Sequence, residues 1–374
     1  MTQISPLLLD QGEGVGMRSC EMSKNVDYII VGQGLAGSIL ALTLLKYGKS
    51  VIVIDQTKAS TASKVAAGLY NPVVFKRLVK SWMADDLLTY MDEFYPEMQE
   101  LLGAEFYFSK RILKPFAEEQ EKALWLKKVE EPIGKYLNEA IFEDDLNGII
   151  YNPLGISEVM HAGNVDTIQF LNSSKDYFQK NNLFIDELFD YNQIKIEEET
   201  VNYKDISASK IIFCEGYKAI ENPYFKWLPF KLTKGEILTI KLKHTHHIPF
   251  NTVINKAVFI LPVGNDTYKV GATYEWQDLT ESITEKGKNY LVEKLQKILK
   301  IPFEIINHQA GIRPTVNDRR PLIGLHPEHS QLAVFNGMGT KAVMLAPFFA
   351  FQFANALRHH TALDKEVDIA RFKK

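Results

Sequence analysis

Three glycines near the N-terminus, Gly32, Gly34 and Gly37, have the spacing GxGxxG that can bind the pyrophosphate of a dinucleotide. The first glycine of such a turn allows a tight bend, the second lets the backbone approach the pyrophosphate, and the third lets helix and strand pack closely. A helix that begins there presents free N–H groups to the phosphates. Asp55 follows Gly32 by 23 residues and can accept hydrogen bonds from ribose hydroxyls. Because an acid at this position disfavours a 2′-phosphate, the motif predicts FAD or NAD rather than NADP.

The sequence around these glycines predicts the elements that such a site needs. Residues 29–31 form a short apolar run that ends in glycine, which is typical of a buried parallel strand. Residues 38–45 predict an apolar helix that ends at Gly48, and residues 51–54 predict a second strand with Asp55 at its tip. A glycine turn without a ligand is the alternative, and the presence of all these parts in order speaks against it.

A second group of glycines lies far along the chain. It begins at residues 311–314, which read Gly-Ile-Arg-Pro, and continues to a predicted strand at residues 332–335. A turn at residues 336–341 then opens an apolar helix over residues 342–357. Two glycines and a threonine at the start of this helix predict a second helix N-terminus that can receive an anion.

These motifs, in this order, resemble the D-amino-acid-oxidase superfamily of FAD-dependent amine oxidoreductases, to which glycine oxidase, monomeric sarcosine oxidase and D-amino-acid dehydrogenases belong. The resemblance covers residues 26–357 and implies that the dinucleotide is FAD. The family sometimes attaches flavin through a C-terminal cysteine, and because none follows Cys214, non-covalent FAD is expected. Besides the glycine turn and Asp55, the resemblance rests on residues 63–68, 211–216 and 234–236, on the Gly-Ile-Arg-Pro run with Asp318, Pro321 and Gly324, and on residues 337–347. The residues expected to bind FAD are Gly32, Gly34, Gly37, Asp55, Ser63, Ala67, Gly68, Gly216, Gly337, Gly339, Thr340 and Lys341.

The resemblance implies an α/β protein in which a Rossmann-type FAD-binding domain is interleaved with an antiparallel-sheet substrate domain. Residues 1–25 are expected to form a leader without structure. The domains are expected to comprise residues 26–90, 150–228 and 308–374 for FAD binding, and residues 91–149 and 229–307 for the substrate.

Patterns in the second half of the chain agree with such a substrate domain. Residues 230–242, 256–263 and 267–273 are rich in β-forming residues and are joined by turns. Residues 289–299 carry apolar side chains at helical spacing, which predicts a helix with one buried face. Thr284 is a candidate to cap the start of that helix.

The resemblance implies that the chain oxidises the C–N bond of a small amine or amino acid, of the glycine, sarcosine or D-amino-acid type, to an imine. Flavin accepts the hydride at N5, so the protein must orient the substrate C–H bond and tune the ring. Reduction places negative charge around N1 and the C2 carbonyl, and the helix start at residues 337–341 is expected to stabilise it. The electron acceptor, oxygen or a quinone or carrier, is left open.

Arg313 is the first candidate for binding the carboxylate of such a substrate, because a guanidinium can form two parallel hydrogen bonds with it. In glycine-oxidase-like relatives the arginine of this motif has that role. Sarcosine-oxidase-like relatives use a lysine at the start of the last helix, which matches Lys341, with an upstream arginine for which Arg77 is a rough candidate. A structural ion pair between Arg313 and Asp318 is the alternative.

Lys269 is the third catalytic candidate. In sarcosine-oxidase-like relatives a lysine aligned here lies near flavin N5 and promotes the reaction with oxygen. Strand alternation puts Lys269 on the face opposite Tyr268 and Val270, so its side chain can point inward or to solvent. Because lysine is rarely buried, the sequence favours an exposed side chain.

Two alternatives to this function stay open. Residues 71–72, Asn-Pro, followed by Lys76, Arg77 and Trp82 depart from the sarcosine-oxidase pattern, and the run also resembles the flavin domain of a bacterial tRNA-modifying enzyme. Such an enzyme would act on a carboxymethylaminomethyl base, with a local basic patch around Lys76, Arg77 and Lys80. A flavin-binding sensor without turnover is the other alternative.

Composition and charge exclude several classes of protein. The net charge of −3 gives no global attraction to nucleic acid or to an anionic membrane, and the resemblance implies a small-molecule amine or amino-acid partner. The apolar run at residues 342–351 is too short to span a bilayer, and we expect a soluble, cytoplasmic protein. No acid or cysteine completes a ligand set around His244, His246 and His247, so no metal site is expected.

Overall fold

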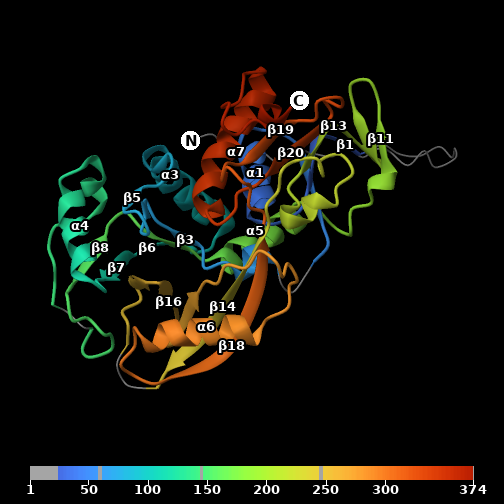
Figure 1. Ribbon diagram of the computed structural model, residues 1–374. Coiled ribbons are helices and arrows are strands. Elements are labelled where there is room, and N and C mark those ends of the chain that lie inside the picture. Colours follow the sequence, from blue (N-terminus) through green and yellow to red (C-terminus); the bar gives the residue numbers. More distant parts are fainter. Residues whose placement is uncertain (1–23, 58–60, 144–145, 244–246, 374) are drawn as a thin grey trace.

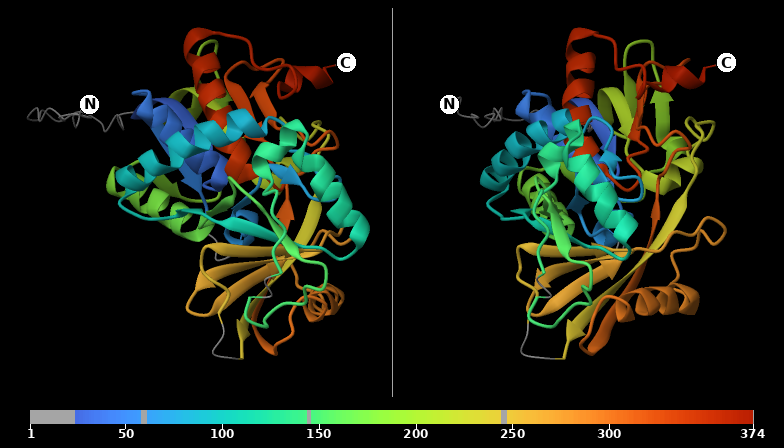
Figure 2. Two further views of the ribbon diagram at one scale, coloured as in Figure 1. Left: turned by 90° about the vertical axis from the view of Figure 1, so that its left-hand side faces the viewer. Right: turned by 60° about the vertical axis from the view of Figure 1, so that its left-hand side comes forward.

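The computed structural model describes residues 24–57, 61–143, 146–243 and 247–373. Figures 1 and 2 show two parts stacked on each other, one around β1 and β13 with helices α1 and α7, the other around β14, β16 and β18 with helix α6. Segments far apart in the sequence meet in the first part, because the N-terminal strand β1 lies beside a strand from the middle of the chain. None of the helices within the described ranges is long and apolar enough to cross a membrane.

The first sheet has a parallel centre. β1 (Lys24–Val31) pairs in parallel with β2 (Val51–Asp55) on one side and with β13 (Ile206–Phe213) on the other. The strands at its centre are apolar without alternation because helices and loops cover both faces, and Ile29 and Ile30 are fully buried. The other strands of this sheet are β10 (Phe184–Asp186), β11 (Ile194–Ile196), β12 (Val201–Tyr203), β19 (Leu322–Leu325) and β20 (Leu332–Asn336).

Four helices share the larger apolar core with this sheet. The most extensive of their contacts join the first and the last of them, α1 and α7, so segments from the two halves of the chain pack together. Each of these helices buries leucine, phenylalanine, methionine or alanine side chains in this core. They are α1 (Leu35–Lys46), α3 (Ala84–Leu102), α5 (Thr167–Lys180) and α7 (Ala342–His359).

The second sheet has seven strands and is mainly antiparallel. β14 (Thr233–Leu242) lies between β17 (Thr267–Gly271) and the long edge strand β18 (Phe303–Arg313). Helix α6 (Glu285–Gln296) covers one face, and its Leu291 and Leu295 are fully buried there. The remaining strands, in order from β17, are β16 (Val258–Gly264), β15 (Thr252–Lys256), β7 (Arg111–Pro115) and β8 (Ile156–Val159).

Shorter elements connect the two parts. A three-stranded sheet places β9 (Gly163–Val165) between β3 (Leu69–Tyr70) and β6 (Tyr107–Ser109). A small hairpin of β4 (Val73–Val74) and β5 (Val79–Lys80) follows β3. The remaining helices are α2 (Ala62–Val65), α4 (Glu119–Val129) and the 3₁₀ turns Pro132–Tyr136, Tyr191–Gln193, Gly216–Ile220 and Ile369–Phe372.

The predicted elements are present in the structure, and their ends differ from the predicted ones by up to five residues; the helix predicted at residues 289–299, for example, is α6 and begins at Glu285. The helix predicted at residues 38–45 begins earlier, at Leu35, directly after the glycine turn. Residues 24–25, predicted as part of the leader, belong to β1 and pair with residues 206–207, because β13 is long enough to extend the ladder. The rest of the leader lies outside the described residues.

The α/β fold class is confirmed, and so is the cap of α6, where Thr284 Oγ1 accepts a hydrogen bond of 2.9 Å from Gly287 N. The predicted domain limits stay a prediction. One strand departs from these limits: β8 lies within the range 150–228 that was assigned to FAD binding, but it pairs in the seven-stranded sheet.

Candidate active site

The turn between β1 and α1 has the backbone shape that its glycines predict. Gly32 has φ of +102°, and a Cβ atom there would lie 2.6 Å from the carbonyl oxygen of Cys214. A Cβ atom at Gly37 would lie 1.8 Å from the carbonyl oxygen of Gly32. Only glycine therefore fits at these two positions, the first because of conformation and space, the second because α1 packs directly on the turn.

The start of α1 is open to a ligand. Gly34 is the N-cap and supplies no side-chain hydrogen bond, and the first turn of the helix carries no acid. Ser63 Oγ accepts a hydrogen bond of 3.2 Å from Leu35 N, which fixes α2 against this end of α1. Free N–H groups at a helix start bind phosphate oxygens, so this end of α1 is suited to a pyrophosphate.

Two acids lie at the carboxyl ends of the neighbouring strands. Asp55 ends β2, and its Oδ2 accepts a hydrogen bond of 2.9 Å from Gln33 N inside the glycine turn. Glu215 follows β13 and was not predicted as a site residue. Burial raises the pKa of the Glu215 carboxyl, which accepts hydrogen bonds from the Tyr191 hydroxyl and, at 2.7 Å, from Asn222 Nδ2. Its signal in the sequence is its position after an apolar strand, where ligands of parallel sheets bind.

A cavity of about 700 Å³ runs from this turn to the second sheet, which is within the usual range of ligand-binding pockets. Gly37, Gly337 and Lys269 are not among its lining residues. A Cβ atom at Gly337 would lie 2.9 Å from Leu322 N, so this glycine, like Gly37, allows close packing behind the wall. The predicted residues that line the cavity are Gly32, Gly34, Asp55, Ser63, Ala67, Gly68, Gly216, Arg313, Gly339, Thr340 and Lys341.

The lining of this cavity fits FAD. The glycine turn and the open start of α1 are suited to the pyrophosphate, and Asp55 to a ribose. Three further glycines, Gly235, Gly271 and Gly311, come from neighbouring strands of the seven-stranded sheet and leave room for an extended planar ring to approach the backbone.

Arg313, the last residue of β18, places a partly buried guanidinium on the cavity wall. Its Nη1 and Nη2 donate to the carbonyl oxygen of Thr273 at 3.3 and 3.4 Å, and its guanidinium carbon lies 4.7 Å from the ring centre of Tyr274. The side chain crosses Gly235, where a Cβ atom would lie 1.8 Å from Nη2. Burial lowers the pKa of Arg313 from its ordinary value.

The structure contradicts the alternative assignment of Arg313 to an ion pair with Asp318. Asp318 Oδ2 accepts from Arg371 Nε at 3.1 Å instead. No acidic side chain in the described part of the chain forms an ion pair with Arg313. The guanidinium therefore keeps N–H donors available to a ligand in the cavity.

Lys341 is the N-cap of α7 and also lines the cavity. Its Nζ donates a hydrogen bond of 2.5 Å to Ser81 Oγ, next to the β4–β5 hairpin. Burial, together with the nearby charge of Arg319, lowers the pKa of Lys341 to about 8. Like Arg313, it has no acidic partner among the described residues.

Lys269 does not have the exposed side chain that the sequence favours. Its Nζ donates a hydrogen bond of 3.1 Å to the carbonyl oxygen of Ala66, and burial lowers its pKa against the opposing effect of Asp166. The exposed assignment is wrong because both faces of this sheet are covered: Tyr268 and Val270 face α6, and the face with Lys269 meets the loop before β3. Lys269 thus holds the backbone of Ala66, a residue that lines the cavity.

A loop between β17 and α6 forms the outer wall beside Arg313. It is held by Lys234 and Glu236, which belong to the motif at residues 234–236 and for which the sequence predicted no role. Lys234, fully buried, binds Asp278 at 2.6 Å. Glu236 accepts hydrogen bonds from Thr284 N at 2.9 Å and from Thr284 Oγ1 at 2.7 Å. The loop carries Tyr274, which lines the cavity and is more than half exposed.

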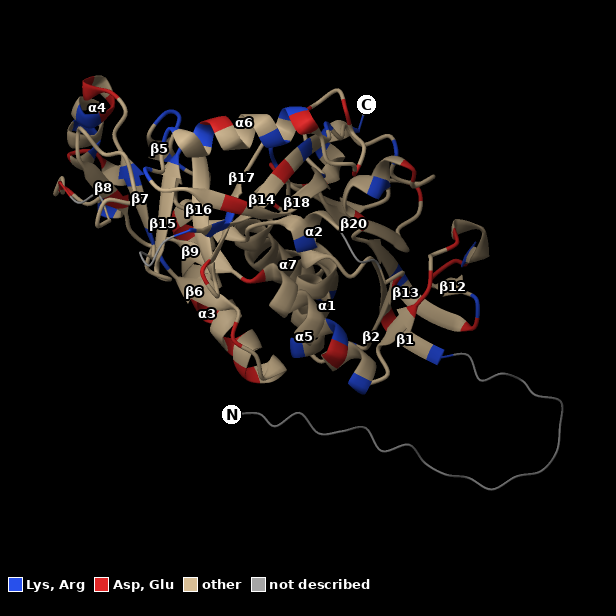
Figure 3. Cartoon of the chain, turned by 90° about the horizontal axis from the view of Figure 1, so that it is seen from below, with Lys and Arg blue, Asp and Glu red and all other residues tan. Residues whose placement is uncertain are grey.

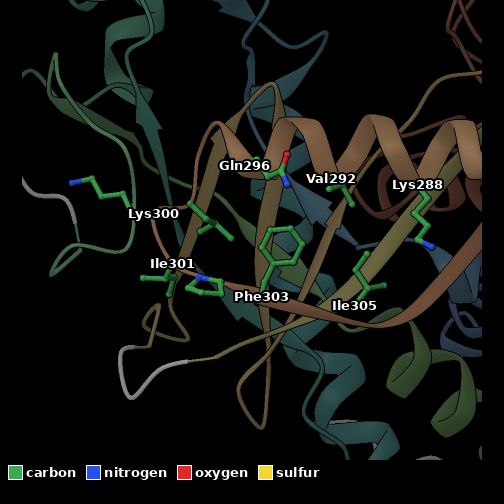
Figure 4. Close-up of a pocket in the computed structure, with 9 residues that line it drawn as sticks. Lys288, Val292, Gln296, Lys300, Ile301, Phe303 and Ile305 are labelled. Carbon is green, nitrogen blue, oxygen red and sulfur yellow. The ribbon is translucent and has the colours of Figure 1, made fainter.

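A second hollow, also of about 700 Å³, lies between α6 and β18. Figure 4 shows its lining, which includes Val292, Phe303 and Ile305 with Lys288 at one end. It contains none of the predicted site residues. Within the described ranges no group of three or more His, Cys, Asp or Glu side chains could hold a metal, and His244 and His246 lie outside those ranges.

Known proteins resemble this chain in sequence and in fold. Glycine oxidase of Bacillus subtilis (strain 168) is 22% identical over 370 residues, covering 93% of this chain and 95% of that protein. The tRNA 5-methylaminomethyl-2-thiouridine biosynthesis bifunctional protein of Legionella pneumophila (strain Corby) is 24% identical over 323 residues, and the match covers 80% of this chain but only 45% of that protein. The crystal structure of iminodiacetate oxidase from Chelativorans sp. BNC1 has a similar fold, with a TM-score of 0.76 at 18% identity, covering 91% of this chain and 98% of that one. The model of the FAD dependent oxidoreductase family matches residues 27–356, so the chain belongs to this family and FAD is its cofactor.

Proposed function

We propose that the protein oxidises the C–N bond of a small amine or amino acid that carries a carboxylate, producing an imine. The observation that carries this proposal is Arg313, a partly buried guanidinium on the wall of the FAD cavity with no acidic partner among the described residues. Burying an unpaired charge is unfavourable, so a guanidinium kept in this position favours an anionic ligand. A carboxylate matches its planar set of donors.

The glycine turn and Arg313 would have separate roles, the first in binding FAD and the second in binding the substrate. Gly32, Gly34 and the start of α1 would hold the pyrophosphate of FAD, and Asp55 a ribose. Bound FAD supplies a hydride acceptor at N5. Arg313 would bind the substrate carboxylate and thereby orient the C–H bond next to the nitrogen, and orientation of this kind lowers the barrier.

The start of α7 would contribute electrostatic stabilisation. Gly339 and Thr340 line the cavity immediately before the helix begins, and no acid lies in its first turn. A helix N-terminus and the ammonium of Lys341 both favour negative charge nearby. Negative charge that develops during hydride transfer would therefore be stabilised from this side.

The test is anaerobic titration of the purified, FAD-loaded protein with glycine, sarcosine, D-amino acids and proline. We expect one of them to bleach the visible absorbance of the flavin, and readmitted air would then distinguish an oxidase from a dehydrogenase. Amines that lack a carboxylate serve as the control and should bleach the flavin much more slowly. Equal bleaching by substrates with and without a carboxylate would contradict the role of Arg313.

A carboxymethylaminomethyl base in tRNA is a second candidate substrate, because it contains the same type of C–N bond. Lys76 and Arg77 favour it: both are exposed in the turn between β4 and β5 and form no ion pair within the described residues. Figure 3 shows the basic colour on the loop beside β5. Lys80 weakens it, since its ammonium pairs with Asp85 at 2.5 Å. Bleaching of the flavin by unmodified small amines but not by tRNA carrying this base would exclude this candidate.

A further inference from the structure

One carboxyl on the cavity wall has no part in the proposed reaction. Glu215 follows the end of β13 by two residues and lines the cavity. It lies against the glycine turn, because a Cβ atom built on Gly32 would be 3.5 Å from Glu215 Cα. Glu215 is therefore adjacent to the part of the cavity that fits the dinucleotide.

Two neutral donors hold this carboxyl from the protein side. The hydroxyl of Tyr191 donates to Oε1 of Glu215, and Asn222 Nδ2 donates to Oε2 at 2.7 Å. Asn222 is fully buried, and its Oδ1 accepts from the backbone N–H groups of Tyr224 and Phe225 at 2.9 and 3.2 Å. Because the amide oxygen is used in this way, the amide N–H group is turned toward the carboxyl and fixes its orientation.

Glu215 has no cation that balances its charge. Lys218 is near enough to affect the pKa of this carboxyl, but no lysine or arginine within the described ranges forms an ion pair with it. Each carboxyl oxygen keeps acceptor capacity after one hydrogen bond. Removing such a group from water without further donors is unfavourable, so a ligand that brings an N–H or O–H group is favoured at this wall.

The position of Tyr191 indicates which half of the cofactor Glu215 faces. Tyr191 lies in the segment that follows β10, and β10 pairs with β2 so that Asp186 is opposite Asp55. Tyr191 also lines the cavity, and it thus connects Glu215 to the side of the sheet where Asp55 is suited to a ribose. A carboxylate repels the pyrophosphate, which leaves the adenosine half of FAD as the source of donors.

We infer that Glu215 binds the adenosine half of FAD, as a second carboxyl beside Asp55. The adenosine half has two kinds of donor, the ribose hydroxyls and the 6-amino group of adenine, and a carboxyl accepts from either. The inference goes beyond the proposed function and is independent of it, because it concerns the cofactor and not the substrate.

The experiment measures the dissociation constants of FAD and of two FAD analogues for protein that has been freed of its cofactor, from the change in flavin fluorescence. One analogue contains hypoxanthine in place of adenine and lacks the 6-amino group. The other contains 2′,3′-dideoxyribose in its adenosine half and lacks both hydroxyls. In Glu215→Gln we expect FAD to bind about tenfold more weakly, as the loss of a hydrogen bond to a charged group implies.

The analogues separate a contact with FAD from a structural role. An analogue that lacks the group bound by Glu215 should lose less than about twofold in Glu215→Gln, because the contact is already absent. The analogue that behaves in this way identifies the donor, a hydroxyl or the amino group. Equal losses for FAD and both analogues would overturn the inference, since Glu215 would then only support Tyr191 and Asn222.

The matched control is Glu187→Gln. Glu187 also accepts a hydrogen bond from a tyrosine hydroxyl, that of Tyr203 at 3.0 Å, but it does not line the cavity. All three dissociation constants should stay within about twofold of those of the unmodified protein. A loss for FAD as large as that in Glu215→Gln would mean that a carboxyl outside the cavity has the same effect, and would contradict the inference.

Two further measurements keep the test decisive. If Glu215→Gln does not fold, Glu215→Asp keeps the charge and withdraws it by one methylene, and the same comparison applies: a loss for FAD that one analogue escapes supports the inference, and equal losses or none contradict it. The unmodified protein needs no variant. If it binds FAD and both analogues equally well, no carboxyl binds the adenosine half and the inference is wrong.

Discussion

The two ends of the cavity are built in different ways. At the glycine turn, the backbone forms the site: Gly32 and Gly37 leave no room for a Cβ atom, and α1 offers its N–H groups. At the other end, side chains form the site: Arg313 and Lys341 are charged groups held by single hydrogen-bond acceptors from distant segments. A backbone site tolerates almost no substitution, whereas a side-chain site can change its ligand through one residue.

This difference predicts the largest effect at Gly32. In Gly32→Ala, the left-handed backbone and the contact with the carbonyl oxygen of Cys214 together should destabilise the protein by about 3 kcal/mol or more. We expect the purified variant to contain little FAD and to have a clearly lower Tm. Absorbance and thermal unfolding measure both.

The control for this variant is Gly48→Ala. Gly48 has φ of +72°, and no atom lies within 4 Å of the position of its Cβ. Strain alone should therefore cost about 1–2 kcal/mol, and FAD should stay bound. A Gly32→Ala variant that retains a full complement of FAD would show that the contact, and with it the description of a backbone site, is wrong.

The next largest effect is expected at Arg313. In Arg313→Met, kcat/KM for a substrate with a carboxylate should fall about 100-fold or more, because a buried charged hydrogen bond contributes about 2–5 kcal/mol. Binding of FAD should be kept, since Arg313 acts at the side-chain end. Arg313→Lys should recover part of the loss. Steady-state kinetics and flavin content are the measurements.

Arg358→Met is the matched control. Arg358 also lies over a tyrosine ring, with its guanidinium carbon 4.5 Å from the centre of Tyr47, and it does not line the cavity. Its kcat/KM should remain within about threefold of the unmodified protein. Similar losses in both variants would mean that removing a stacked arginine lowers activity through stability alone.

The same contrast explains which parts of the site the sequence predicts. The glycine turn is local, so its spacing, its strands and the position of Asp55 appear within one short stretch and agree with the structure. Arg313 is found through its motif, but its contacts Thr273 and Tyr274 come from a loop about forty residues earlier, which no local pattern connects to it.

Lys269 shows the limit of strand alternation. The pattern places it on one of two faces but does not say what covers each face. In this sheet both faces are covered, so the assumption that lysine faces solvent fails, and the side chain reaches Ala66 instead. The start of β1 at Lys24 was missed for a similar reason, because the partner that extends it lies in β13.

A smaller effect is expected at Glu236, which anchors the outer loop. Glu236→Gln replaces one acceptor by a donor opposite Thr284, and we expect a stability loss of about 1–3 kcal/mol. A loosened loop should raise KM more than it lowers kcat, because the loop carries Tyr274, which lines the cavity, but carries none of the reacting atoms. Exposed Glu285→Gln, on the neighbouring turn of α6, is the control. A fall in kcat at unchanged KM would contradict a purely anchoring role.

The smallest effect is the pH dependence that Lys341 adds to stability. Burial holds its pKa at about 8 in the folded protein, against 10.5 in the unfolded chain, so between these values the unfolded chain binds more protons. Stability from this group therefore rises with pH across that interval, and below pH 8 the buried charge is unfavourable.

Lys341→Met removes the charge and should be the more stable form below pH 8, by an amount on the order of 2 kcal/mol, with the difference shrinking toward pH 10. Denaturant unfolding of both proteins across this range measures it. A difference that is constant with pH would mean that Lys341 is not charged and buried. The cation at the α7 end would then lose its basis, and the cavity would keep Arg313 as its single charged contact.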